Sequence, residues 1–277
     1  MPLLQMLTLA AVQGITEFLP VSSSAHLILV PKLTGWPDQG LLIDVAVHVG
    51  TLLAVILYFW KDNLAMISAI FQSFRQLPNR NPLNPEFSLM IKLVLATIPV
   101  LIAGYIINRY LGNAFRSLEV IGWTTLCFAL LLLIADKLSM TIRKINHITF
   151  KGAIVIGLFQ ILALIPGTSR AGITITAARF QGIERRDAAR FSLLLSIPVI
   201  FAAGCLKSFD LYILGNQAYF KEALVIAALS FGFAMTAISL MMFWLRNFSY
   251  TPFVVYRIAL GATLLFITYK FPHFQFW

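Results

Sequence analysis

Two short polar segments interrupt an otherwise strongly apolar chain, and they resemble each other. Residues 20–26 read PVSSSAH and residues 166–172 read PGTSRAG, so both begin with proline, carry hydroxyl groups at the centre and have alanine in sixth place. Each follows an apolar stretch that contains a glutamine, Gln13 or Gln160. Polar groups buried in lipid without partners cost several kcal/mol each. Two matching interruptions of this kind predict the two halves of one site.

The composition is typical of an integral membrane protein. Of the 277 residues, 59% are hydrophobic and 12% are charged, and the mean hydropathy is +0.85. These values exclude an ordinary soluble globular domain. The net charge is +10, but the basic residues are scattered between apolar runs. We therefore expect no nucleic-acid partner and interpret them as topology signals and contacts with anionic membrane lipid. Residues 1–13 lack a basic leader and a small-residue cleavage site, so no secretory signal peptide is expected.

Six apolar runs are long enough to cross the hydrocarbon core of a membrane, which takes about 20 residues. The runs are 43–60, 88–107, 120–136, 189–206, 223–245 and 252–269. A further segment, 63–76, has apolar residues at helical spacing among polar ones. We predict that this segment is an amphipathic helix at the membrane interface rather than a seventh span.

Two pairs of shorter helices are predicted around the polar segments. Residues 152–165 would form a helix of about 21 Å, whereas the hydrocarbon core is about 30 Å thick. This helix stops at Pro166 and a second short one follows at about 171–181. Residues 3–19 and about 25–33 repeat the arrangement around Pro20. A helix, a polar turn and a helix that do not span describe a re-entrant hairpin, which is tolerated only where it is buried in protein or lines a wet cavity.

The order of elements is hairpin, three spans, hairpin, three spans. A duplicated unit with an odd number of crossings must face the opposite way in the membrane. We therefore predict an all-α polytopic membrane protein with six transmembrane helices and two re-entrant hairpins in inverted-topology repeats. The repeats cover about 1–137 and about 151–270 of a single membrane domain, 1–277. Lysine and arginine are most frequent in connections on one side, which the positive-inside rule assigns to the cytoplasm. Both termini and the polar turns are then expected to face outward.

The second arm of each hairpin begins next to hydroxyl side chains. We expect Ser23 or Ser24 to cap the arm that ends near Leu33, and Thr168 or Ser169 to cap the arm that ends near Gln181. A helix N-terminus presents unpaired N–H groups and a partial positive charge, which suit a phosphate. The alternative explanation for the serines is capping and turn formation alone.

Gly167 and Arg170 strengthen the prediction of a phosphate site. A glycine lets the backbone approach a ligand closely. Arginine presents a planar fork of donors that matches two phosphate oxygens at once, and a charge at membrane depth usually has a function. Together they predict a cradle for a diphosphate. Tyr256 and Arg257, inside the last span, either reach a phosphate too or snorkel to the interface.

Gln13 and Glu17 are four residues apart and so share one helical face. A carboxylate and an amide oxygen suit a hard divalent cation, Mg²⁺ or Ca²⁺, that also binds phosphate oxygens. Glu17 could instead be a base that activates a serine or water, with His26 as acid or base. The structural alternatives are that Glu17 pairs with Arg170 and that His26 satisfies a buried hydrogen bond.

These residues resemble a known family. Residues 13–26, QGITEFLPVSSSAH, and residues 166–174, PGTSRAGIT, are similar to the two signatures of the undecaprenyl-diphosphate phosphatases, the BacA-type enzymes associated with bacitracin resistance. The first signature is a Glu/Gln-x-x-x-Glu pair before a serine-rich turn and a histidine, and the second is Pro-Gly-x-Ser-Arg-x-x-x-Thr. Residues 44–50 and 252–257 resemble further family stretches, so the similarity covers nearly the whole chain.

The resemblance implies removal of one phosphate from undecaprenyl diphosphate, a C55 lipid carrier for peptidoglycan synthesis, at the outer face of the cytoplasmic membrane and with a divalent cation. It implies that Glu17 is catalytic and that Gln13 takes the Glu-or-Gln place. The remaining site residues that it implies are Ser22, Ser23, Ser24 and His26 in the first half, and Gly167, Thr168, Ser169, Arg170 and Thr174 in the second. Glutamine at position 13 weakens any mechanism that needs two carboxylates on the metal.

Our mechanistic hypothesis assigns the phosphates to Arg170 and the two helix N-termini, and the cation to Gln13 and Glu17. Ser23 is then the nucleophile, activated by Glu17, with His26 assisting the proton transfers. Direct attack by water is the competing scheme. Because broken helices in inverted repeats are also transporter architecture, a transporter or flippase of an anionic phosphorylated lipid is the alternative function. A homodimer is left open beside a monomer.

Overall fold

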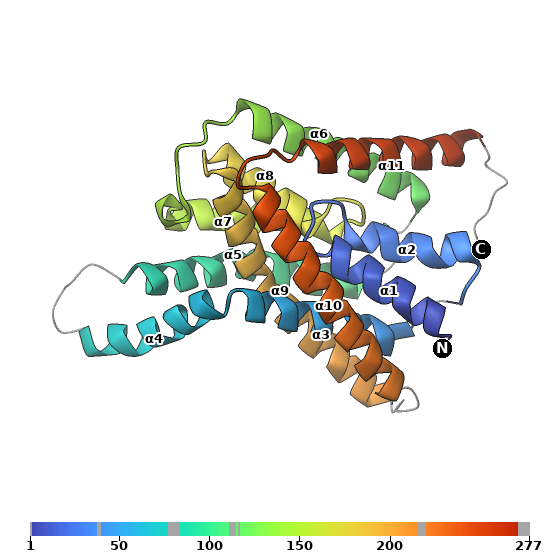
Figure 1. The fold of residues 1–277 in the computed structure, drawn as a ribbon, viewed down its shortest axis with the longest axis horizontal. Coiled ribbons are helices and arrows are strands. Elements are labelled where there is room, and N and C mark those ends of the chain that lie inside the picture. The colour runs from blue at the N-terminus through green and yellow to red at the C-terminus, as the bar shows by residue number, and fades with distance from the viewer. Residues whose placement is uncertain are drawn as a thin grey trace.

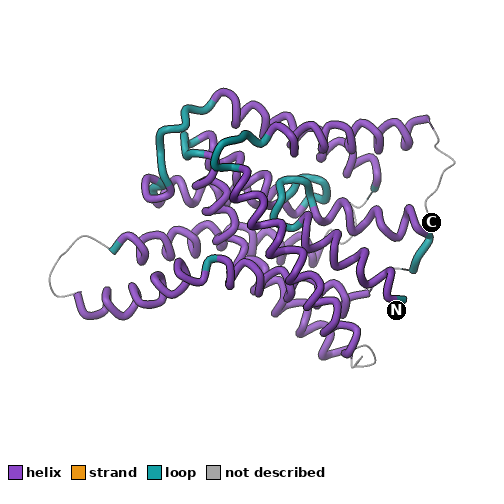
Figure 2. Tube along the Cα trace, in the orientation of Figure 1, coloured by secondary structure: helices purple, strands orange, loops and turns teal. Residues whose placement is uncertain are grey.

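A computed structural model describes residues 2–37, 40–76, 84–110, 115, 117–214 and 220–270. These residues are helical, apart from their connections and one isolated bridge between Arg143 and Ile183 (Figure 1, Figure 2). In the first half the helices are α1 (Leu3–Thr16), α2 (Ser23–Thr34), α3 (Gly40–Tyr58), α4 (Trp60–Gln76), α5 (Pro85–Tyr110) and α6 (Leu118–Leu138). In the second half they are η2 (Ile145–His147), α7 (Phe150–Ile161), η3 (Leu162–Leu164), α8 (Arg170–Phe180), α9 (Arg185–Leu214), α10 (Phe220–Trp244) and α11 (Thr251–Lys270).

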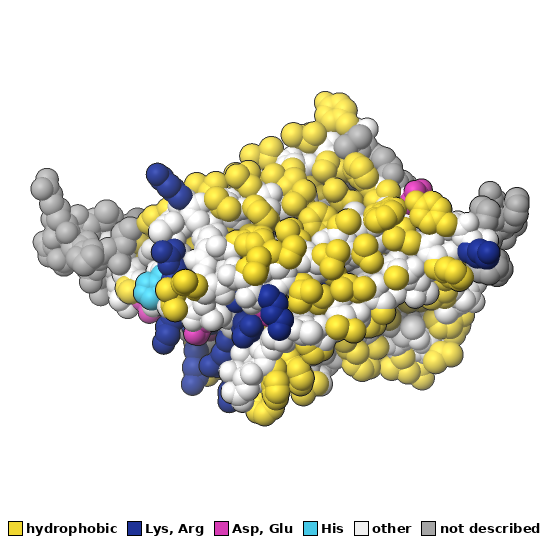
Figure 3. All heavy atoms as spheres, turned by 90° about the horizontal axis from the view of Figure 1, so that it is seen from above, with side chains coloured by type: hydrophobic (Ala, Val, Ile, Leu, Met, Phe, Trp, Pro, Cys, Tyr) yellow, Lys and Arg dark blue, Asp and Glu magenta, His cyan; other side chains and the backbone are white. Residues whose placement is uncertain are grey.

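Six helices are long and apolar enough to cross a membrane: α3, α5, α6, α9, α10 and α11. Their apolar parts agree with the six predicted runs to within a few residues at each end. At most 44% of any of these parts is buried inside the protein, so the rest of their apolar surface is available to lipid. Figure 3 shows one such face, on which hydrophobic side chains cover the centre while most lysines and arginines gather toward one end. The prediction of an all-α protein with six helices that can span a membrane is confirmed.

The four helices around the polar segments are short, as predicted. α1 has 14 residues, α2 and α7 have 12 each, and α8 has 11. At 1.5 Å per residue none of them reaches the thickness of the hydrocarbon core, about 30 Å. The loops that join α1 to α2 and α7 to α8 come together in the middle of the molecule (Figure 2).

The spans enclose these short helices. α1 packs against α10, and α7 packs against α5. α8 lies against both α6 and α9, while α6 and α11 run side by side along one edge of the molecule (Figure 1). The largest hydrophobic cluster includes buried residues of α8 and α9, with Ile175, Ala178 and Leu194 fully buried. The second polar segment is therefore held inside a packed core.

The predicted amphipathic segment 63–76 is helical and begins earlier, at Trp60. One face of this helix, α4, buries Met66 and Ala69, whereas Leu64, Ile67 and Phe71 are more than half exposed. An exposed apolar row on a polar helix is what a helix at the membrane interface requires. The interfacial position itself stays a prediction.

Candidate active site

The first turn (residues 17–22) and the second turn (residues 165–169) end on the same unusual backbone. Ser22 precedes α2 with φ 79° and ψ 93°, and Ser169 precedes α8 with φ 69° and ψ 111°. They are the two non-glycine residues with positive φ in the described part of the chain. Such conformations cost about 1–3 kcal/mol each and persist only where the surroundings enforce them, often at functional sites.

This shared conformation corrects the alignment of the two segments by one residue. Matching their prolines pairs Ser23 with Ser169, but the backbone pairs Ser22 with Ser169. Ser23 and Arg170 then hold the same place, the first residue of a helix. With this alignment Gln13 and Gln160 are also equivalent, because each lies nine residues before its serine.

The capping prediction was right for one arm and wrong for the other. The Ser169 hydroxyl accepts from the Gly172 N–H at 3.1 Å and caps α8. In the first turn the N-cap residue is Ser22, and its side chain makes no capping hydrogen bond. Instead, the Ser22 and Ser24 hydroxyls lie 3.3 Å apart. Ser23 does not cap because it is the first residue of the helix, and its hydroxyl donates to a carboxylate.

That carboxylate is Glu17, at the end of α1, and both turns meet on it. Its Oε2 accepts from the Ser23 hydroxyl at 2.7 Å and from the Gln13 amide at 3.0 Å. Its Oε1 accepts from Arg170 Nη2 at 2.9 Å. Burial would raise the pKa of Glu17, but the Arg170 guanidinium, with smaller effects from His48 and Ser23, keeps that pKa below its ordinary value. Glu17 is therefore an ionised carboxylate within reach of a serine proton.

Arg170 is held from both sides. Its Nη1 donates to the Ser192 carbonyl of α9 at 3.1 Å, and its Nη2 donates to Glu17. The Thr174 hydroxyl lies 2.7 Å from the Ser192 hydroxyl. Thr174 is fully buried, so it braces the residue that positions Arg170. The structural alternative for Glu17, its ion pair with Arg170, is present.

His26 has both ring nitrogens engaged. Nδ1 lies 2.7 Å from the Ser22 carbonyl, so it must carry the proton and donate to that oxygen. Nε2 lies 2.6 Å from the Tyr256 hydroxyl, and the two rings are stacked at 5.7 Å. Burial lowers the pKa of His26, and the hydrogen bond to Ser22 opposes this only in part. His26 is thus a neutral imidazole that accepts from Tyr256. Among the described hydrogen bonds it has none with Glu17 or Ser23.

Arg257 joins the two turns from α11. Its guanidinium is fully buried and donates to the carbonyls of Gly167 at 3.0 Å and Thr168 at 2.9 Å through Nη2, and to the Pro20 carbonyl at 3.5 Å through Nη1. Snorkelling is therefore excluded for this residue. The sequence left contact with a phosphate and snorkelling open, and it gave no signal of this role because nothing in a span shows which carbonyls a side chain will contact.

Glycine is required at position 167 for a reason other than the expected close approach of the backbone to a ligand. Its φ is +94°, and a Cβ at this position would lie 2.7 Å from the Ile121 carbonyl of α6. The Thr124 hydroxyl of the same helix donates to the Pro166 carbonyl at 2.6 Å. Glycine is needed because the second turn presses against α6. Thr124 is a support that sequence reasoning missed, and a hydroxyl within an apolar span was its only signal.

The donor set fits one divalent cation only with help from other oxygens. Gln13 Oε1 is buried and has no hydrogen-bond partner among the described residues, as is also true of Thr168 Oγ1. Among the described residues no three His, Cys, Asp or Glu side chains cluster as metal ligands. One carboxylate and one free amide oxygen match a cation that takes its remaining ligands from phosphate and water. The residues present fit Mg²⁺ or Ca²⁺ in that sense.

The chain is similar to known proteins over nearly its whole length. The model of the family described as bacitracin resistance protein BacA matches residues 6–263. The chain is 48% identical to an undecaprenyl-diphosphatase of Ruegeria pomeroyi over 271 residues, which cover 98% of this chain and 100% of the relative. It is 50% identical to that of Roseobacter denitrificans, with the same coverage. It is 46% identical to that of Alcanivorax borkumensis over 95% of this chain and 97% of the relative.

Proposed function

Because the chain belongs to the BacA family of bacitracin resistance proteins, we propose that it is an undecaprenyl-diphosphatase whose active site is formed by the two turns around Glu17 and Arg170. One observation carries the placement of the site. Glu17 and Arg170 are 153 residues apart in the chain, yet they form a 2.9 Å ion pair between the two turns. The activity recycles the lipid carrier for peptidoglycan synthesis and confers bacitracin resistance.

The hydrolysed bond is a phosphoanhydride, so catalysis consists mainly of positioning and of neutralising charge on the transferred phosphoryl group. Arg170 offers two donors in a plane, and the first turns of α2 and α8 offer backbone N–H groups. In the proposed binding step the diphosphate takes over the Arg170 donor that Glu17 accepts in the structure. Glu17 is then left beside the Ser23 hydroxyl, 2.7 Å away.

The covalent step follows from that contact. Glu17 takes the Ser23 proton while Ser23 Oγ attacks the terminal phosphorus, and the bond from that phosphorus to the bridging oxygen breaks. Undecaprenyl phosphate leaves, and a phosphoserine remains. Glu17 gives the proton taken from Ser23 to the departing undecaprenyl phosphate and is ionised again. It then takes a proton from water as the water attacks the phosphoserine, and it returns that proton to Ser23 Oγ as the bond to phosphorus breaks, which releases inorganic phosphate and restores the Ser23 hydroxyl. We assign to neutral His26 a proton exchange through Nε2, which requires that the Tyr256 hydroxyl release this nitrogen. Direct attack by water on the diphosphate remains the competing scheme.

A divalent cation would be held by Glu17 and by Gln13 Oε1, the buried oxygen that has no protein partner among the described residues. Such a cation, Mg²⁺ or Ca²⁺, supplies positive charge that offsets the charge of the phosphate oxygens. Gln13 already donates its amide N–H to Glu17 at 3.0 Å, which orients both side chains on one face of α1.

We also propose the membrane arrangement of the two hairpins. The short lengths of their arms support a re-entrant course, and the equivalent packing of α1 on α10 and of α7 on α5 supports inverted repeats. The paired backbone conformations of Ser22 and Ser169 support the same duplication. With the lysine- and arginine-rich connections in the cytoplasm, the termini and the two turns face outward.

Phosphate release by the purified protein tests the function. In detergent micelles no second compartment exists, so a hydrolase releases inorganic phosphate from undecaprenyl diphosphate, whereas a transporter or flippase releases none. Arg170→Ala should abolish release, and Arg109→Ala, which removes an exposed arginine of α5, should not. Activity that survives in Arg170→Ala would contradict the assignment of the site. Lack of release by the wild type would contradict the function.

A further inference from the structure

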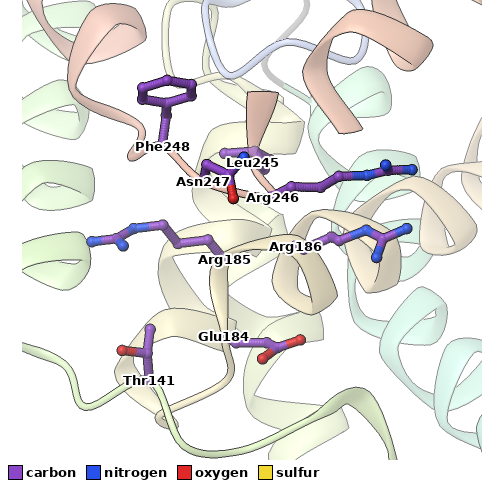
Figure 4. A pocket seen from close by; sticks show the side chains of 8 residues that line it. All are labelled: Thr141, Glu184, Arg185, Arg186, Leu245, Arg246, Asn247 and Phe248. Atoms are coloured by element: carbon purple, nitrogen blue, oxygen red, sulfur yellow. The ribbon is translucent and has the colours of Figure 1, made fainter. Parts of the chain in front are cut away.

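A second basic site lies where α9 begins and α10 ends, away from the two turns. Side chains there surround a cavity of about 310 Å³, and they include Arg185, Arg186, Arg246, Asn247 and Phe248 (Figure 4). Along α9, Arg186 precedes Ser192, the partner of Arg170, by six residues, or about 9 Å of helix. The cavity therefore shares a helix with the candidate active site but not its residues.

One of the three arginines already has an ion-pair partner. Arg185 Nε lies 2.7 Å from Asp136 Oδ1, and buried Asp136 also faces Arg179 at 3.4 Å. The Asp136 Oδ2 accepts from the Tyr250 N–H at 3.3 Å. In Figure 4 Arg185 points away from the other two arginines. This buried network fixes the start of α9 and holds the Arg185 guanidinium on Asp136.

The other two arginines are not committed to any carboxylate. Arg186 and Arg246 extend in the same direction from neighbouring helix ends (Figure 4), and neither forms an ion pair in the part of the chain that the structure describes. Both are exposed. Glu184 is the one acidic residue in the lining. Two free guanidinium groups against one carboxylate leave the cavity net positive.

The position of the cavity relative to the apolar spans indicates its ligand. The candidate membrane span of α9 begins at Arg185 and that of α10 ends at Trp244, so the cavity lies at one end of both spans. Phe248 is 52% exposed and its ring stacks on Trp244 at 4.3 Å, while the Arg246 guanidinium lies over the Phe243 ring at 5.8 Å. Exposed aromatic rings beside arginines are typical of the level of lipid headgroups.

We propose that this cavity binds a phosphate anion at the membrane surface, with Arg186 and Arg246 as its ligands. Arginine suits this role because its planar fork can donate to two phosphate oxygens. The phosphate is carried by an anionic phospholipid or is free inorganic phosphate. The apolar wall of Phe248 and Leu245 favours the lipid, since a free ion would gain nothing from it. This site is separate from the proposed catalytic site and lies at the end that we assign to the cytoplasm.

Native mass spectrometry of the full chain in detergent tests the proposal with phosphatidylglycerol, phosphatidylcholine and inorganic phosphate as probes. The wild type should retain phosphatidylglycerol in preference to phosphatidylcholine. Arg186→Gln/Arg246→Gln should weaken its binding about 25-fold, because each basic residue near an anionic headgroup contributes about a factor of five. The matched control Lys137→Gln/Lys151→Gln removes two exposed charges outside the cavity and should bind like the wild type.

The outcomes separate the two sources of phosphate. If millimolar inorganic phosphate displaces the lipid from the wild type, and the arginine variant shows no such displacement, the site binds free phosphate. Equal retention of both phospholipids, or equal binding by the arginine variant and the wild type, would overturn the proposal. Phosphate release in micelles should be unchanged in the arginine variant, which shows that it is folded. Arg170→Ala should lose release and keep lipid binding, so the failure of one site is not mistaken for failure of the other.

Discussion

Ser22 and Ser169 share a left-handed backbone conformation, at φ 79° and 69°, immediately before α2 and α8. The residue after each serine is therefore presented by the first turn of a short helix. These residues are Ser23 and Arg170, and they contact the two oxygens of Glu17 at 2.7 Å and 2.9 Å. A duplicated backbone thus delivers a hydroxyl and a guanidinium to one carboxylate.

Glu17→Gln should reduce phosphate release by about 10² to 10⁴, the usual contribution of a positioned base. Glutamine keeps the shape of the side chain but cannot take the Ser23 proton. The variant also leaves Arg170 without its ionic partner, so its melting temperature in detergent should fall. Glu119→Gln, an exposed carboxylate on α6, is the matched control and should release phosphate normally. Less than a tenfold loss in Glu17→Gln would exclude the general-base role.

Ser23→Ala should abolish turnover, whereas Ser24→Ala should stay within a few-fold of the wild type. Ser23 donates to Glu17, while exposed Ser24 contacts only the Ser22 hydroxyl among the described hydrogen bonds. In rapid-quench experiments the wild type should accumulate label from a terminally ³²P-labelled substrate on Ser23. Near-normal turnover by Ser23→Ala would refute the covalent scheme and favour direct attack by water.

Arg257→Lys should loosen both turns at once. One ammonium group cannot replace the Nη2 bonds to Gly167 and Thr168 together with the Nη1 bond to Pro20. Because a hydrogen bond to a charged group contributes about 1.5–3 kcal/mol, the variant should lose about 2–5 kcal/mol of stability. The kcat should fall more than the KM rises, since Arg257 orients catalytic groups without contacting substrate. The control Arg109→Lys, at an exposed site, should leave both stability and kcat unchanged. A normal kcat in Arg257→Lys would refute the positioning role.

The sequence predicted the fold better than the details of the site, for a physical reason. Spans and short arms follow from the length of apolar runs against the thickness of a bilayer, which is a local property of the chain. The roles of Arg257 and Thr124 depend on contacts between segments far apart in sequence, with carbonyls of the second turn. No pattern in their own spans shows those contacts.

The two polar segments were predicted to form one site, and the structure brings Glu17, Ser23 and Arg170 together. The error lay in matching the segments by their prolines. The first turn is one residue shorter between its proline and its positive-φ serine, so Ser22 rather than Ser23 precedes the helix. Backbone conformation decides that register, and serine, which rarely adopts positive φ, gives no warning of it.

The pH dependence of kcat should have its acid limb below pH 6.5, the ordinary pKa of histidine, if neutral His26 is required. Burial lowers the pKa of His26, so the imidazole charges only at a pH below that value and the active form persists at pH 6.5. Below its lowered pKa, His26 gains a proton on Nε2 and can no longer accept from Tyr256. In His26→Gln the kcat should be lower at every pH, and its pH dependence should lack this acid limb. A limb centred above pH 6.5 in the wild type would contradict the assignment.

Gln13→Glu should lower the Mg²⁺ concentration needed for half-maximal activity, by about tenfold, because added ligand charge tightens cation binding. Gln13 Oε1 is buried beside Glu17 and without a partner among the described residues, so a second carboxylate would share the cation with Glu17. Without the cation, the two carboxylates repel each other, and the variant should melt at a lower temperature in EDTA than the wild type. Gln13→Leu removes the oxygen at similar size and should raise the required Mg²⁺ concentration. An identical Mg²⁺ requirement in all three proteins would exclude Gln13 as a metal ligand.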